Sequence, residues 1–456
     1  MNPIPQGYKQ TEIGVIPEDW EIKSIGKDAV LKARIGWQAL TTSEYESTGS
    51  YFLVTGTDFD AGEVIWERCC YVSEWRYKQD TNIQLRTDDV LITKDGTIGK
   101  VGYVAALYKP STLNSGVFVI RPKNAAFIPR YLFYVLTSRV FDDFIKRITA
   151  GSTITHLYQK DFVNFEFIAP TKEEQTAIAT ALSDVDALIT GLESLIAKKQ
   201  AIKTATMQQL LTGKTRLPQF AHHPDGTPKG TQQTELGEIP EDWGVVEFGS
   251  VLKEFRNGYA FSASGYASTG TPIITMAQIG LSGSFQFDIS KVNKWDSLQY
   301  DLLKDFWVRD GDLLIAMTDV TPDKNLIGQM TIAKLDGIAL LNQRVGLLRF
   351  KNEIAYSGYF NFLSCLPVWR AYCKGVASLG VQANIGTSDI RKAKVPLPPI
   401  KEQSAIAQVL SDMDEEIQTL QTRLSKTQHI KQGMMQQLLT GKVRLVKPLH
   451  GESQHG

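Results

Sequence analysis

Several features that mark common protein classes are scarce or missing in this 456-residue sequence. Its four cysteines form no CxxC pair and show no spacing typical of zinc ligands. No apolar run approaches the roughly 18 residues that a membrane helix needs, and the first residues lack the apolar core of a secretory signal. These absences predict a reduced, cytoplasmic protein with no metal site and no membrane partner.

Motifs of catalysis are missing as well. The sequence has no GxGxxG loop, no GxSxG elbow, no HExxH pair and no Asn-Pro-Pro-aromatic tetrapeptide. Gly213-Lys214-Thr215 resembles the end of a phosphate-binding loop, but position 208 is glutamine where that loop requires glycine. Four of the six histidines lie in 222–223 and in the last seven residues, so a paired histidine base is not expected. We predict no catalytic residue.

Excess charge of one sign is also lacking, since 49 Lys and Arg balance 49 Asp and Glu. This balance neither favours nor excludes a nucleic-acid partner, because binding depends on where charges cluster. The length is too great for one core and predicts two to four domains.

What the chain does contain is an internal repeat. TEIGVIPEDW at 11–20 returns as TELGEIPEDW at 234–243, with eight of ten residues identical. A stretch that opens with EQTAIATALSD at 174–184 and ends with QQLLTGKTRL at 208–217 returns, without gaps, at 402–445. The segments between these matches, 21–173 and 244–401, repeat far more weakly and are each domain-sized. A duplicated frame with diverged inserts predicts one scaffold with two recognition surfaces.

Both inserts show mixed patterns. Residues 90–107 and 116–122 are typical of β-branched strands with glycine turns, whereas 131–148 is typical of one amphipathic helix. The second insert has a similar helical segment at 358–373, with Pro367 as a break. The five extra residues of the second insert fall between 316 and 340, opposite 93–112. We expect two α/β (α+β) units.

Each unit is followed by a predicted helix of about 40 residues, roughly 60 Å long. Thr171 and Glu174 fit a capping box at the first start, and Gly213 and Gly441 stand where left-handed C-caps belong. Apolar residues recur in steps of four and three from Ile178 to Ile196 and from Ile406 to Leu424. We expect the two helices to pair, the alternative being that each stripe is buried on its own domain. Residues 218–233, including His222 and His223, are expected to form a solvated linker.

The repeated segments resemble the specificity subunit of type I restriction–modification systems. The resemblance is carried by the two IPEDW heads, by PLPPIKEQ at 396–403 with its counterpart APTKEEQ at 169–175, and by the two QQLLTGK tails. It implies two target-recognition domains joined by two long antiparallel coiled-coil helices with an internal pseudo-two-fold repeat. The implied boundaries are 1–170, 171–215, a linker at 216–233, 234–398, 399–446 and a tail at 447–456.

The resemblance implies that each domain reads one half of a split, asymmetric site in double-stranded DNA, while the helices set the spacer. It also implies two methyltransferase subunits and restriction (motor) subunits as partners. S-adenosylmethionine, ATP and Mg²⁺ are then expected in those partners and no cofactor in this chain. A scaffold whose inserts grip proteins is the alternative reading of a duplicated frame.

Base edges are read by forked donors and acceptors, with Lys and Ser/Thr in support, and we predict three groups of candidates. The first follows a strand of each insert: Lys94, Thr97 and Lys100, and Thr318, Lys324 and Asn325. The second precedes each long helix: Thr153, His156, Tyr158, Gln159 and Lys160, and Gln382, Asn384 and Thr387. The third is early in each insert: Arg34, Trp37 and Gln38, and Arg256, Asn257 and Tyr259.

The first two groups each have a plain alternative. The first is equally typical of strand turns, and the second of mere connections. Asn342-Gln343-Arg344 has suitable chemistry, but the match of Asn342 to Asn114 indicates a structural asparagine.

Overall fold

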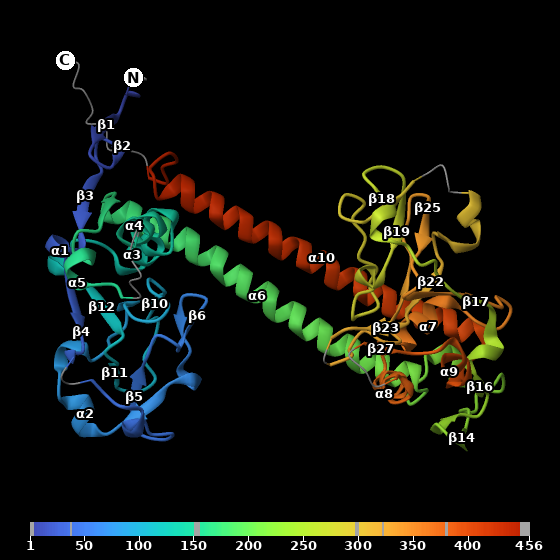
Figure 1. The fold of residues 1–456 in the computed structure, drawn as a ribbon. Helices are drawn as coiled ribbons and strands as arrows, with labels where there is room; N and C mark the ends of the chain where they lie inside the picture. The colour runs from blue at the N-terminus through green and yellow to red at the C-terminus, as the bar shows by residue number, and fades with distance from the viewer. Residues whose placement is uncertain are drawn as a thin grey trace, which may run out of the picture. The chain divides into compact units, whose positions relative to one another are not determined.

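The computed structural model describes residues 4–36, 39–149, 156–296, 301–321, 323–378 and 382–446. The chain divides into two compact units. Unit 1 is Met1–Glu193 with Thr422–Gly456, and unit 2 is Ser194–Gln421. The chain therefore leaves unit 1 within one long helix and returns to it within the other. Figure 1 shows these helices as α6 and α10.

Unit 1 is built on a six-stranded sheet of order β4-β12-β9-β10-β7-β6 and a three-stranded sheet of order β11-β5-β8. Two further strand pairs, β1-β2 and β3-β13, lie at its head. The strands are β1 (Tyr8–Thr11), β2 (Gly14–Pro17), β3 (Glu21–Ser24), β4 (Ala29–Ala33), β5 (Tyr51–Val54), β6 (Phe59–Asp60), β7 (Glu63–Val64), β8 (Cys70–Val72), β9 (Val90–Thr93), β10 (Val101–Tyr103), β11 (Ser111–Leu113), β12 (Val117–Pro122) and β13 (Glu166–Ala169). The helices are α1 (Ile25–Asp28), α2 (Glu74–Lys78), α3 (Pro129–Leu136), α4 (Arg139–Thr149), α5 (Gln159–Phe162) and α6 (Lys172–Leu211).

The strands predicted in the first insert are confirmed as β9, β10 and β12, but the single helix predicted over 131–148 is wrong. The chain breaks there into α3 and α4. Thr137 leaves the helical conformation with ψ near 6°, and the Ser138 hydroxyl accepts from the Val140 amide at 3.3 Å, which caps the new helix. No proline marks this break, whereas Pro367 does mark the corresponding break in unit 2.

Unit 2 repeats this plan. Its sheets have the orders β17-β26-β22-β24 and β18-β20-β19-β25-β21, with the pairs β14-β15, β16-β28 and β23-β27. The strands are β14 (Thr231–Thr234), β15 (Gly237–Pro240), β16 (Gly244–Glu247), β17 (Leu252–Asn257), β18 (Tyr266–Ala267), β19 (Thr271–Ile274), β20 (Lys294–Trp295), β21 (Trp307–Arg309), β22 (Leu313–Ala316), β23 (Thr318–Asp319), β24 (Met330–Ile332), β25 (Ile338–Leu341), β26 (Val345–Phe350), β27 (Ala383–Asn384) and β28 (Lys394–Leu397). The helices are α7 (Ser357–Leu363), α8 (Pro367–Val376), α9 (Thr387–Lys392) and α10 (Ile400–Leu438).

The inserts share a fold that their sequences barely show. In both units an early strand, a late strand and the strand of the DVLI or DLLI segment form one antiparallel ladder. In both, a parallel pair lies in the second sheet, β11 with β5 and β25 with β19. The fold class is α/β (α+β), and the internal repeat is present at the level of strand order.

The long helices pair antiparallel within each unit. In unit 2, Lys199 of α6 forms an ion pair with Glu416 of α10, and Lys203 of α6 forms one with Asp414 of α10. Residue numbers increase along α6 where they decrease along α10, so the two helices are antiparallel. In unit 1, Lys431 of α10 lies 2.5 Å from Asp186 of α6. Pairing of the helices is therefore confirmed.

The alternative interpretation of the apolar stripe also holds, for its first turns. Ile178 and Leu182 are fully buried in the core of unit 1, together with Phe167 and with Leu438 from the end of α10. Ile406 and Leu410 are buried in the core of unit 2 in the same way. Each stripe thus begins as part of a domain core and continues as a helix-pairing seam. As predicted, the helix ends carry left-handed glycines, Gly213 (φ +72°) and Gly441 (φ +71°).

In unit 1, a largely buried cluster of polar side chains joins the IPEDW segment (the head, 16–20) to the start of α6 and to the residues after α10, and it is called the clasp below. The carboxylate of Glu174, fully buried, accepts hydrogen bonds from the Trp20 indole at 3.3 Å and from the Arg444 guanidinium at 2.6 to 2.9 Å. Arg444 also holds Asp19 through two hydrogen bonds of 2.9 and 2.6 Å. The predicted capping box is therefore only half formed. The Thr171 hydroxyl accepts from the Glu174 amide at 3.4 Å, while the Glu174 side chain serves the clasp.

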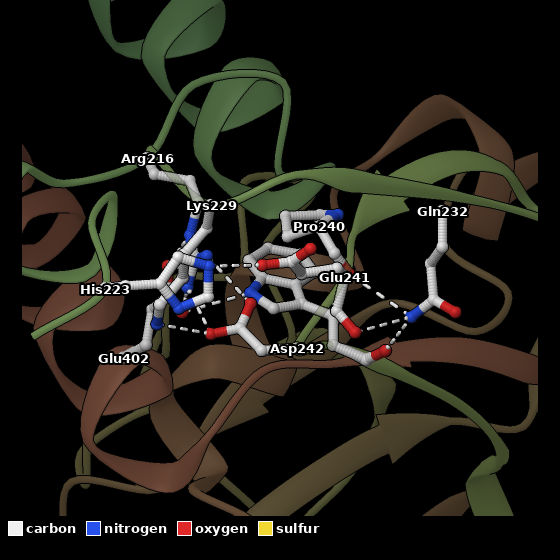
Figure 2. A network of polar contacts seen from close by, with 9 residues as sticks. Arg216, His223, Lys229, Gln232, Pro240, Glu241, Asp242 and Glu402 are labelled. Atoms are coloured by element: carbon white, nitrogen blue, oxygen red, sulfur yellow. Dashed lines mark hydrogen bonds and ion pairs between the residues drawn. The ribbon is translucent and has the colours of Figure 1, made fainter. Parts of the chain in front are cut away.

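Unit 2 contains the same clasp, drawn in Figure 2. Glu402 accepts from the Trp243 indole at 3.0 Å and from Arg216, which also binds Asp242. The tail of the first copy thus closes the head of the second, and the tail of the second copy closes the head of the first.

The segment predicted as a solvated linker contributes to the second clasp. Lys229 lies 2.7 Å from Asp242, His223 lies 2.9 Å from Glu241, and the segment ends in β14. The polar, Pro- and Gly-containing composition predicts a solvated segment, but Lys229 and His223 contact the IPEDW segment at 239–243.

None of the helices in the described part of the chain combines the length and apolar character needed to cross a membrane.

Candidate nucleic-acid interface

One edge of the main sheet of unit 1 gathers segments from two of the predicted groups. At the end of β9, the Lys94 amide donates to the Gly116 carbonyl at 2.9 Å, and the Leu157 amide donates to the Lys94 carbonyl at 2.7 Å. Asp95 and His156 form a β-bridge between the two loops. The loop after the strand and the segment before the long helix are therefore neighbours, which their separation in sequence did not indicate.

Unit 2 builds the corresponding edge with the same backbone pairings. Thr318 pairs with Asn384, and these two residues match Asp95 and His156 in the repeat. The next pair is Asp319 with Ala383. The Met317 amide donates to the Arg344 carbonyl at 3.0 Å, as the Lys94 amide does to the Gly116 carbonyl. The backbone pairing at this edge is therefore repeated in the two units, while the side chains on it differ.

In unit 1 the edge carries cations and aromatic rings. The Lys94 ammonium lies 5.3 Å from the centre of the Phe118 ring. Tyr158 is exposed, its ring lies 4.5 Å from that of His156, and the Lys160 ammonium lies 5.5 Å from its centre. His156 is held by Asp95. An exposed ring beside an ammonium can stack on a base while the cation contacts phosphate.

The remaining candidates of the first loop differ in availability. Thr97 is exposed, and its carbonyl accepts from the Thr93 hydroxyl. Lys100 is half-buried, and its ammonium donates to the Phe59 carbonyl, which ties it to the sheet. Gln159 is exposed at the start of α5.

Arg34 is a correction. It is 1% exposed, and its guanidinium donates to the Leu113 carbonyl at 2.8 Å and to the Thr112 hydroxyl at 3.1 Å. Burial lowers the pKa of Arg34. Because the Arg34 guanidinium is buried and its donors are hydrogen-bonded inside the domain, it cannot contact a base, and its prediction as a DNA-reading residue is wrong. Trp37, Gln38 and Thr153 lie outside the described residues.

In unit 2 the first loop is organised by Asp319. Its carboxylate accepts from the Thr321 amide at 2.8 Å and from the Leu326 amide at 2.6 Å. Burial raises the pKa of Asp319, but hydrogen bonds, including one from Ile327, outweigh burial and hold that pKa below its usual value. The charged carboxylate therefore fixes the loop.

The candidates on this loop are positioned unequally. Lys324 has a left-handed backbone (φ +49°) and is half-buried. Asn325 is exposed, but its side-chain oxygen accepts from the Lys374 ammonium at 2.9 Å. Thr318 is a second correction, because it is 7% exposed and its hydroxyl points to the Met276 sulfur.

The other candidates of unit 2 differ in exposure and in their contacts. Asn384 is exposed and exchanges hydrogen bonds with Gln382. Asn257 and Tyr259 are exposed at the end of β17, and Tyr259 forms a β-bridge with Asn342. Arg256 is less available, since it is paired with Glu254 and Asp305. Thr387 begins α9 and is half-buried.

This edge of unit 2 also carries the triplet Asn342-Gln343-Arg344. Asn342 is the structural asparagine that the repeat predicted, because its side-chain oxygen accepts from the Arg344 amide at 3.1 Å, as Asn114 does from Ser115 at 2.7 Å. The side chains of Gln343 and Arg344 are exposed beside it. The forked side chains of Gln343 and Arg344 have the chemistry of base readers, whereas the match to Asn114 accounts for the asparagine alone.

Among the residues that the structure describes, no three His, Cys, Asp or Glu side chains form a group that could hold a metal ion. The edges are instead polar surfaces on rigid strands, in duplicate. That arrangement defines a class of modular recognition protein, in which one frame presents two different sets of side chains.

Comparison with known proteins specifies the class. The model of the type I restriction modification DNA specificity domain matches the chain twice, at residues 17–204 and 240–428. The chain belongs to this family, as a type I restriction–modification specificity subunit with two recognition domains.

Three relatives match nearly the whole chain. It is 28% identical to the type I restriction enzyme MjaVIII specificity subunit of Methanocaldococcus jannaschii, over 96% of both chains. It is 29% identical to the putative MjaX specificity subunit of the same organism, over 96% of this chain and 97% of the relative. With the EcoKI specificity subunit of Escherichia coli it shares 21% identity, over 94% and 90%.

Solved structures agree on the fold. The chain resembles the type I restriction–modification S subunit from M. genitalium with a TM-score of 0.56 and 14% identity, over 92% of this chain and 96% of that one. It resembles a chain from a study of type I assembly and conformational transition with a TM-score of 0.51 and 17% identity, over 94% and 99%.

Proposed function

We propose that each recognition domain reads one half of a two-part, asymmetric site in double-stranded DNA, and that the paired helices set the spacer between the halves. The observation that carries this is the repeated edge. The Lys94–Gly116 and Met317–Arg344 backbone hydrogen bonds are equivalent, while the side chains around them differ. One frame with unlike side chains reads unlike sequences.

The chain is proposed to act without a catalytic group of its own. Two methyltransferase subunits would supply adenine methylation from S-adenosylmethionine, and restriction subunits would supply ATP- and Mg²⁺-dependent motor and nuclease activity. The balanced charge of the chain fits this division, since partners that contact phosphate would provide much of the affinity.

The test uses the full chain with and without its methyltransferase subunit. The chain alone is expected to bind DNA weakly and to transfer no methyl group. The complex is expected to protect a two-part sequence, with affinity that falls as salt rises because phosphate contacts release counterions. Methyl transfer by the chain alone would overturn the proposal. So would a complex that has no affinity for DNA and binds a protein in a salt-insensitive way. The second result would support a protein-binding scaffold.

A further inference from the structure

The surface around the Lys94–Gly116 hydrogen bond in unit 1 and the Met317–Arg344 hydrogen bond in unit 2 is called the recognition edge below. The cation at this hydrogen bond lies on a different strand in each unit. In unit 1 the cation is Lys94, at the end of β9, and the residue across the backbone hydrogen bond is Gly116. In unit 2 the cation is Arg344, just before β26, and the residue across the bond is Met317. At this repeated backbone contact, the cation therefore lies on one strand in unit 1 and on the other strand in unit 2.

Arg344 is held rigidly by its backbone while its side chain stays free. Its carbonyl accepts from Met317 at 3.0 Å, its amide donates to Asn342 at 3.1 Å, and the neighbouring Gln343 amide donates to the Tyr259 carbonyl at 2.9 Å. Its side chain is exposed. A fixed backbone avoids the cost of ordering the loop on binding, so that only the side chain has to be immobilised, and it can be aimed at a particular base.

The other arginines of the second insert are committed elsewhere or lie elsewhere. Arg256 and Arg349 are in ion pairs, Arg370 donates to the Ile327 and Asn325 carbonyls, and Arg391 lies over the Phe255 ring.

Arg309 is exposed, but it pairs with Ile338 at the beginning of β25, whereas the recognition edge follows the end of β25 at Leu341. Among the described residues of this insert, Arg344 is the arginine that combines an exposed guanidinium, no ion pair and a place at the recognition edge.

We propose that Arg344 is a specificity-determining residue of the second domain and reads a guanine in its half-site. Guanine presents two acceptors in the major groove, and the forked guanidinium donates to both at once. Gln343, exposed beside it, has the amide that pairs best with adenine and is the second reader of this turn. The first domain has Ser115 and Gly116 at these positions and cannot make either contact.

This inference rests on the proposed function, and its test separates the two. The full chain is assembled with its methyltransferase subunit and given DNA in which the second half-site is randomised. Sequencing of the methylated products is expected to show a required guanine for the wild type. Arg344→Ala is expected to accept any base at that position, to modify the original site about 10- to 100-fold less, and to leave the first half-site unchanged.

Arg309→Ala is the matched control, because it removes an exposed arginine from the other end of the same domain. It is expected to modify the wild-type sequence at the wild-type rate. Thermal unfolding of both variants is expected to match that of the wild type, since neither side chain is buried.

Three results would overturn the inference. One is an unchanged sequence for Arg344→Ala. Another is a uniform loss at all positions with a smaller salt dependence, which identifies a phosphate contact. The third is a second half-site without a required guanine. If the wild-type complex methylates no sequence at all, the proposed function fails first, and the inference fails with it.

Discussion

Arg444 donates three hydrogen bonds to the buried carboxylate of Glu174, although 270 residues separate them. The pair closes the first domain with the last segment of the second copy. Arg216 and Glu402 make the equivalent contact in unit 2. The duplication is therefore used reciprocally, because each head is completed by the other copy's tail.

Loss of a clasp carboxylate is expected to destabilise its unit strongly. Glu402→Ala leaves the buried Trp243 indole without its acceptor and leaves the Arg216 guanidinium with Asp242 alone, at a cost of about 1 to 3 kcal/mol. Glu416→Ala is the control. It removes a half-exposed ion pair with Lys199 and should cost less than about 1 kcal/mol. Urea unfolding measures both, and equal effects would contradict the structural role of the clasp.

The glycine that ends each long helix is expected to resist substitution. A Cβ on Gly441 would lie 2.7 Å from the Pro17 ring, and its φ of +71° strains any other residue. Gly441→Ala should lower the melting temperature. Gly433→Ala, in the same helix with open space around it, should instead stabilise by roughly 0.5 to 1 kcal/mol. A melting temperature that is unchanged for Gly441→Ala would count against this close approach.

Acid is expected to weaken the first clasp through Asp19. Its hydrogen bond to Arg444 holds the pKa of Asp19 below the usual 3.8. A lowered folded-state pKa means that the stabilisation is present above about pH 4 and disappears as the pH falls through the folded value. Unfolding midpoints should therefore fall more steeply below pH 4 for the wild type than for Asp19→Asn. Parallel pH profiles for the two proteins would rule this contribution out.

Substitutions at the recognition edge of unit 1 are expected to change the reading of the first half-site only. Tyr158→Ala removes an exposed ring beside the Lys160 ammonium and should weaken methylation of the cognate site. Lys27→Ala, an exposed lysine before the start of β4, is the control, because the recognition edge follows the other end of that strand. Methylation kinetics on sites altered in one half at a time give the readout. Equal effects of Tyr158→Ala on both halves would contradict separate reading.

The spacer is expected to follow helix length. Counting along both helices from the Asp186–Lys431 ion pair, residues 187–193 lie opposite 424–430. Deleting both heptads removes about 10 Å of helix at 1.5 Å per residue, which corresponds to about three base pairs. Mapping the methylated site should show a shorter spacer with the same bases in each half. An unchanged spacer would refute the ruler role.

The sequence predicted the repeat, the helix pair and the C-cap glycines because each is a local or strongly repeated pattern. Gly213 and Gly441 follow a long apolar periodicity and need no distant partner to be recognised. The clasp was out of reach for the opposite reason. Glu174 has the spacing of a capping box, and its actual partners lie 154 and 270 residues away.

The candidate site shows the same limit. Nothing near Arg34 distinguishes a buried guanidinium from a DNA-reading one, since its acceptors, Thr112 and Leu113, belong to a later strand. The convergence of Asp95 with His156, and of Thr318 with Asn384, likewise depends on strand pairing between segments that are far apart in the chain. The match of Asn342 to Asn114 indicates a structural asparagine, and it does not show that the side chain of Arg344, two residues later, is exposed.

The most direct test of the account is to map modified adenines in DNA from cells that carry this chain with its methyltransferase subunit. The account predicts a two-part asymmetric sequence, absent from cells without the chain, in which exchange of residues 244–401 for another recognition domain changes one half only. Modified sites that stay the same after that exchange, or that appear without the chain, would contradict it.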